Sequence, residues 1–143
     1  MQTPREDIMA ALFARLESIE GLATTSRRLK HWADVPSEEQ PALFMAQGNQ
    51  IPEVKTGQPM VWRLPVTVYV YVKTTGEQVP ASVLNPILDA IEAALPLHPI
   101  TGLHDDLGLE GVEWARISGP IETSEGTLGD QEVAMIPIEI LAT

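Results

Sequence analysis

Four side chains that could bind a metal ion lie close together in the sequence. They are His98, His104, Asp105 and Asp106, in the segment LHPITGLHDDLGLEG. Imidazole nitrogens and carboxylate oxygens are common metal ligands, but this spacing matches no closed zinc pattern. Glycine and proline mark the segment as a loop, in which polar residues are usually solvated. We therefore predict neither a metal site nor a cofactor.

The other residue types that carry catalysis form no recognisable constellation. There is no Gly-x-Ser-x-Gly elbow, and the scattered glycines form neither a phosphate-cradling loop nor a dinucleotide fingerprint. The 20 Asp and Glu residues are spread over every segment, which is typical of a solvated surface. The absence of cysteine excludes thiolate catalysis, disulfides and cysteine zinc sites. We predict that the protein is not an enzyme.

A basic cluster stands out in this acidic chain. Arg27, Arg28 and Lys30 are a third of the nine Lys and Arg residues, although the formal net charge is −11. That balance argues against general nucleic-acid binding, which needs a basic surface. Two interpretations remain open for the basic cluster: protection of an exposed strand edge, or contact with an acidic patch of another copy. Aromatic residues and Arg are enriched at interface centres. The candidate assembly residues are therefore Arg27, Arg28, Lys30, Trp32, Lys55, Tyr69 and Tyr71.

Two helices are predicted. The first spans 3–20, where Thr3 and Glu6 could form a capping box and Pro4 suits the first helical position. The second spans roughly 80–95, and its regular part should begin late enough to leave Pro86 in the first turn. Apolar residues recur at helical spacing in both segments, at Ile8, Leu12, Leu16 and Ile19 and at Leu84, Leu88, Ile91 and Leu95.

The clearest strand is WRLPVTVYVYVKT (62–74). Its valines alternate with Thr67, Tyr69 and Tyr71, so one face is a core face and the other is half apolar. That second face needs partial cover from this chain or from a neighbouring copy. Further strands are predicted near 23–31, 41–47, 112–122 and 132–141. Pro137 cannot donate to a ladder, which predicts that the last strand lies at an edge or carries a bulge.

These elements follow the order α-β-β-β-α-β-β. They predict one α+β domain over 1–143, with a single mostly antiparallel or mixed sheet and both helices packed on one face. A long connection at 48–60 is typical of a functional or mobile segment. No apolar run approaches the ~20 residues that a membrane span needs. The start MQTPREDIMAALF lacks the layout of a signal peptide, so we expect a cytosolic or assembly-bound protein.

Four stretches lie between the first predicted helix and the last predicted strand: "IEGLATTSRRLKHWADVPSEEQPALFMAQG", "VTVYVYVKT", "VLNPILDAIEAAL" and "GPIETSEGTLGDQEVAMIPIEIL". They resemble the tail terminator (tail completion) proteins of long-tailed bacteriophages and prophages. The resemblance implies a homohexameric ring that caps the tail tube, ends tube polymerisation and provides the joining surface for the head connector. It implies a location in the virion at the neck, after assembly in the host cytoplasm. Tail tube protein and connector would be its partners, and DNA would pass through without specific binding.

The acidic composition fits a ring through which DNA passes, because an acidic bore repels the DNA backbone and lets the DNA slide. A closed ring also needs two different, complementary surfaces, which the basic cluster and the acidic body could provide. Two alternatives stay open. One is another neck component, such as a stopper or a head-to-tail joining protein. The other is a monomeric α+β binding module.

Overall fold

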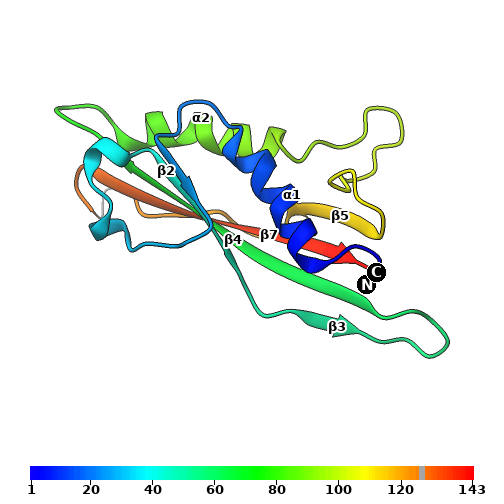
Figure 1. Ribbon diagram of the computed structural model, residues 1–143. Helices are drawn as coiled ribbons and strands as arrows, with labels where there is room; N and C mark the ends of the chain where they lie inside the picture. The colour runs from blue at the N-terminus through cyan, green and yellow to red at the C-terminus, as the bar shows by residue number, and fades with distance from the viewer. Residues whose placement is uncertain (126–127) are drawn as a thin grey trace.

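A computed structural model describes residues 1–125 and 128–143 and confirms the α+β class and the order of elements. Figure 1 shows both helices on one side of a long twisted sheet, with the two chain ends side by side. The helices are α1 (Arg5–Glu17) and α2 (Pro80–Ala93), and two short 3-10 turns are η1 (Trp32–Asp34) and η2 (Ser37–Glu39). The strands are β1 (Thr24–Ser26), β2 (Ala42–Gln47), β3 (Ile51–Glu53), β4 (Val61–Lys73), β5 (Val112–Ile117), β6 (Glu122–Thr123) and β7 (Gln131–Ala142).

The sheet is built on one long antiparallel pair. β4 and β7 pair along their whole length, from Trp62 opposite Ala142 to Lys73 opposite Gln131. Within the described residues the path is β1-β2-β4-β7-β5, with β3 also on β4 and β6 also on β7. β1 is parallel to β2 and the other pairs are antiparallel, so the sheet is mixed as predicted. β3 was not predicted from the sequence pattern, and the single strand predicted near 112–122 is divided into β5 and β6.

One continuous core lies between the helices and the sheet. The core face of β4 is the one predicted from its alternation, because every apolar side chain from Leu64 to Val72 at even positions is buried there. The even positions of β7 from Ala134 to Ala142 join them. The helices contribute Ile8, Met9, Leu12 and Leu16 from α1, and Leu84, Ile87 and Ile91 from α2.

The two prolines of the central strands correct one prediction. The last strand was predicted to lie at an edge or to carry a bulge at Pro137. β7 is instead an interior strand, Pro137 pairs with Thr67 in regular register, and the register shift against β5 lies at Val112 and Trp114. The carbonyl of Pro137 accepts a hydrogen bond from Ser118 N, which shows that this residue's backbone faces the gap where β5 has ended and β6 has not begun. Pro65 of β4 has the same arrangement, since its carbonyl accepts from Gly48 N between β2 and β3. Each proline therefore keeps the bond to its carbonyl and lacks only the reciprocal N–H bond, at a position just past the end of the neighbouring strand.

The helix starts also differ from the prediction. Thr3 donates its hydroxyl hydrogen bond to the carbonyl of Glu110 instead of capping α1, and Glu6 pairs with Arg27, so no capping box forms. In α2, Pro86 lies inside the helix and not in its first turn, because the helix already begins at Pro80. The Pro86 side chain is exposed to solvent, so it displaces no side chain of the core. In the part of the chain that the structure describes, no helix has the length and apolarity to cross a bilayer.

The predicted strand 23–31 is too long, because only Thr24–Ser26 pairs with β2. The chain then leaves the sheet edge and crosses to the face opposite the helices. There the Tyr71 hydroxyl donates to the carbonyl of Lys30 (2.6 Å), and Val35 packs beside Tyr71 and Phe44. A buried glutamine pair holds the end of this crossing, since Gln131 Nε2 donates to Gln40 Oε1 (3.0 Å). The chain itself thus covers part of the tyrosine face.

One carboxylate in the core makes stability depend on pH. Glu132 is 1% exposed and its Oε2 has no hydrogen-bond partner among the described residues. Burial raises its pKa above that of an ordinary glutamate, and the nearby charge of Glu125 raises it further. The folded state therefore holds this proton more tightly than the unfolded chain does. The resulting stabilisation is complete below the ordinary glutamate pKa and is lost as pH rises through the folded-state pKa.

We expect Glu132→Gln to stabilise the protein near neutral pH by about 1 kcal/mol, because it removes the cost of a buried charge. Urea denaturation at mildly acidic and mildly alkaline pH measures this. The gain should shrink at acidic pH, where the wild-type carboxyl is protonated. The exposed Glu113→Gln serves as the matched control and should leave the pH dependence unchanged. A gain that is equal at both pH values would contradict the assignment.

Candidate assembly surface

The sheet face opposite the helices carries an apolar groove. A pocket of about 550 Å³ has Tyr69, Tyr71, Val133 and Met135 along the sheet. A second pocket of about 330 Å³ continues along the same face and shares Tyr69 and Met135 with the first. We call these joined pockets the tyrosine groove. Its two walls are the crossing segment, with Leu29, Lys30, His31 and Trp32, and the β6 side, with Pro120, Glu122, Ser124 and Leu128.

Four of the seven nominated residues meet at this groove. Lys30 and Trp32 line one wall, and Tyr69 and Tyr71 line the sheet side. Lys30 and Tyr71 are 41 positions apart in the sequence, and the crossing of the chain after β1 brings them together. Burial raises the pKa of Tyr71, and the neighbouring Tyr69 raises it further, so the phenol stays a hydrogen-bond donor to Lys30.

The basic cluster is divided in the structure. Arg27 forms an ion pair with Glu6 of α1, and its hydrogen bond lowers the pKa of that carboxyl. Arg28 and Lys30 are exposed, and neither makes a side-chain ion pair with the described part of the chain. Arg27 therefore has a role within the fold, whereas the charges of Arg28 and Lys30 have no ion partner in residues 1–125 and 128–143.

Lys55, the seventh nominated residue, lies in a projecting hairpin. The segment predicted as a connection at 48–60 contains β3, which pairs with the start of β4, and Figure 1 shows this hairpin extending beyond the rest of the sheet. Arg63 fixes its base through ion pairs with Glu53 and with Glu139 (2.7 Å to the latter). Arg5 adds a 2.6 Å hydrogen bond to Gln50 and stacks on Trp62. The hairpin is thus tied to the body at its base.

Residues 54–60, which we call the hairpin tip, are apolar for an exposed segment. Val54 is 69% exposed and Met60 is 45% exposed. Lys55 is the single charged residue of the tip. The tip is therefore a small apolar and basic surface on an acidic protein, and all of its residues are exposed.

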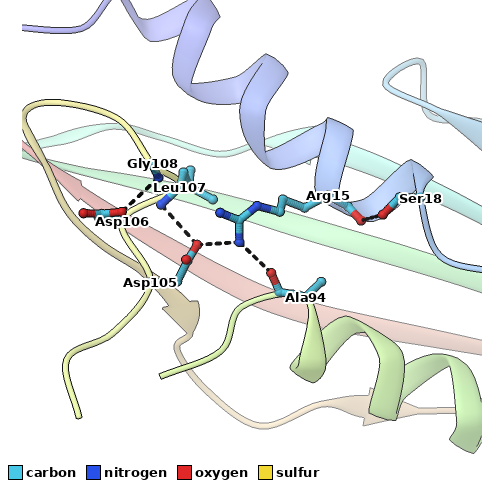
Figure 2. Close-up of polar contacts among 7 residues, drawn as sticks. All are labelled: Arg15, Ser18, Ala94, Asp105, Asp106, Leu107 and Gly108. Carbon is cyan, nitrogen blue, oxygen red and sulfur yellow. Dashed lines mark hydrogen bonds and ion pairs between the residues drawn. The ribbon is translucent and has the colours of Figure 1, made fainter. Parts of the chain in front are cut away.

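The loop that carries His98, His104, Asp105 and Asp106 has a structural role, because its Asp105 binds Arg15 of α1 (Figure 2). Arg15 of α1 donates to Asp105 (2.8 Å) and to the carbonyl of Ala94 (3.0 Å), just after α2 ends. Asp105 also accepts from Leu107 N, and Asp106 accepts from Gly108 N. Through Arg15, these contacts join the loop to α1 and to the end of α2. Both carboxylates also accept a hydrogen bond from a backbone N–H of their own loop. In residues 1–125 and 128–143, no three His, Asp or Glu side chains cluster as metal ligands would.

Sequence reasoning missed several groove residues, among them Leu29, Val133 and Met135. One signal could have found the last two. They alternate with the core positions of β7, so an apolar residue stands on both faces of that strand, as in the tyrosine strand. Leu29 carries no such signal, because its place depends on where the chain leaves the sheet.

Solved structures share this fold, and two of them show how far the likeness extends. A chain from the virion of a native gene transfer agent (GTA) particle superposes with a TM-score of 0.57 at 12% identity, covering 94% of this chain and 93% of that chain. A second solved protein, known by a sequence identifier alone, has a TM-score of 0.54 at 17% identity and covers 99% and 96%. The sequence matches no protein-family profile and no curated protein. At such identities the likeness shows a common fold over nearly the full length.

Proposed function

We propose that this protein is a structural subunit of a phage-type particle and that its copies form a six-membered ring on the end of the tail tube. The ring ends tube polymerisation and presents the surface to which the head connector joins. The observation that carries the proposal is the match, over nearly the whole length of both chains, to a component of a virion. The sequence resemblance to tail terminator proteins adds the position within the particle.

The surfaces described above support a ring. A head-to-tail contact between identical subunits needs two different surfaces on each copy, and the rotation between neighbours must close. The hairpin tip and the tyrosine groove are two such unlike surfaces. The net charge of −11 suits a bore that DNA traverses without specific binding, because like charge repels the phosphate backbone. In this proposal the protein works by assembly and has no enzymatic activity.

Multi-angle light scattering of the purified protein tests the ring. We expect a species with six chain masses, in equilibrium with monomer as the protein is diluted. A monomer at every concentration, both alone and mixed with tail tube protein, would favour the monomeric binding module. Electron microscopy of particles that carry a labelled subunit tests the position. A label where tube meets neck supports a terminator, whereas a label on the head side of that junction identifies a stopper or joining protein.

A further inference from the structure

We propose that the hairpin tip of one copy docks in the tyrosine groove of the next copy around the ring. This inference deepens the proposed function, on which it rests, by naming the two surfaces of the subunit contact. The occupant is a second copy of this chain. Other occupants, such as a segment of the tube protein, are outcomes of the test below.

The first argument is that a copy's tip cannot reach its own groove. Both features are attached to β4, which begins next to the tip at Val61 and carries Tyr69 and Tyr71 near its other end. Ten residues separate Val61 from Tyr71, which corresponds to roughly 30 Å along a strand. The ion pairs of Arg63 hold the hairpin base against the sheet. A tip can therefore enter only the groove of another copy, and such a contact is head-to-tail.

The second argument is chemical fit. The tip offers Val54 and Met60, whose side chains are exposed in the single chain. The groove offers Tyr69, Val133 and Met135 in pockets of about 550 and 330 Å³, a size at which proteins bury small ligands or a few side chains. Burying both apolar surfaces together removes them from water, which favours the contact.

The third argument is charge. Lys55 is the one charge of the tip, and Glu122 lines the β6 wall of the groove. Glu122 is exposed and makes no ion pair with a described residue. A docked Lys55 would meet this carboxylate. The opposite wall carries the positive charge of Lys30, so the charges select one orientation of the tip in the groove.

Thiol crosslinking tests the contact directly, because the chain has no cysteine of its own. We mix Val54→Cys protein with Leu29→Cys protein, add a short bismaleimide reagent, and compare the yields of covalent dimer. The mixture should give on the order of ten-fold more dimer than either protein alone, since docking of the tip at the groove wall of another copy raises the effective concentration of the two thiols. In the matched control, Asn85→Cys on the exposed side of α2 replaces Leu29→Cys and should give the background yield.

A reciprocal charge swap is the second variant set. Lys55→Glu and Glu122→Lys should each weaken self-association by about ten-fold, and the double variant should recover it, because the ion pair is then restored in reverse. Both substitutions are on exposed residues, so the monomers should stay folded. Circular dichroism checks this.

The outcomes separate the inference from the proposed function. A hexamer without the Val54–Leu29 crosslink and without the charge-swap recovery overturns the inference and leaves the ring in place. Crosslinks of Val54→Cys with itself would also overturn it, because they mean that two tips meet. Crosslinking of the tip to tube protein and not to Leu29 identifies the tube as the occupant. Absence of any multimer overturns the ring and the inference together.

Discussion

Val68→Asp is expected to unfold the protein. Val68 is 0% exposed and lies in the core between the sheet and both helices. An unpaired carboxylate at this position costs several kcal/mol, against a total stability of about 5–15 kcal/mol for a typical domain. Circular dichroism and urea denaturation of the purified variant measure the effect. The expected result is loss of the cooperative unfolding transition.

Lys73→Asp is the matched control for that experiment. Lys73 is exposed at the end of the same strand, so the same new side chain should change stability by no more than about 0.5 kcal/mol. A folded Val68→Asp protein with a normal transition would contradict the assignment of the core face of β4.

Reversing the basic cluster is expected to abolish assembly without unfolding the monomer. The variant carries Arg27→Glu, Arg28→Glu and Lys30→Glu together. Apart from these three residues and Lys55 of the tip, the chain holds 20 acids and five bases, so a neighbouring copy presents a mainly acidic surface outside its tip. Like charges across an interface cost several kcal/mol, and exposed ion pairs contribute little to folding. Light scattering should show monomer at concentrations where the wild type is a ring.

The structure provides a matched control for this variant too. Arg27→Glu alone removes the ion pair with Glu6 but leaves Arg28 and Lys30 in place. We expect it to assemble, because Arg27 does not line the tyrosine groove. The prediction is wrong if the triple variant keeps its full ring mass and still yields particles with tails of uniform length joined to heads. The basic cluster would then be an exposed surface without a role in assembly.

Local pattern is enough to predict the class of most elements. The helical spacing of Ile8, Leu12 and Leu16 and the alternation around Val68 each report which side of an element is buried. Burial of one face is a local requirement, and it leaves a periodic trace in the sequence. For the same reason, the half-apolar face with Tyr69 and Tyr71 predicts a cover, part of which the crossing segment supplies.

The errors occur where distant segments compete for the same groups. Thr3 could cap its own helix, but the carbonyl of Glu110 takes its hydroxyl. Pro137 predicts an edge or a bulge, yet it lies in regular register in an interior strand, at a gap between two partners. A proline shows which hydrogen bond is missing. It does not show whether the strand beside it happens to end there.

The candidate site is predicted as a set of residues, and its shape is not. Lys30, Trp32, Tyr69 and Tyr71 are nominated by type alone, because basic and aromatic residues favour interfaces. Their meeting in one groove depends on the chain leaving the sheet after Ser26 and crossing to the tyrosine face. Residue type likewise does not separate Arg27, which pairs with Glu6, from its neighbours.

The sequence by itself thus determined the α+β class, the order of the elements and the buried faces of both helices and of β4. These follow from periodicity, which each segment carries independently of the others. Only the tertiary structure decided the length of β1, the place of β7 in the sheet, the hairpin formed by 48–60 and the groove opposite the helices. Each of these depends on hydrogen bonds or packing between residues far apart in the chain, and such pairings leave no periodic signal in either partner.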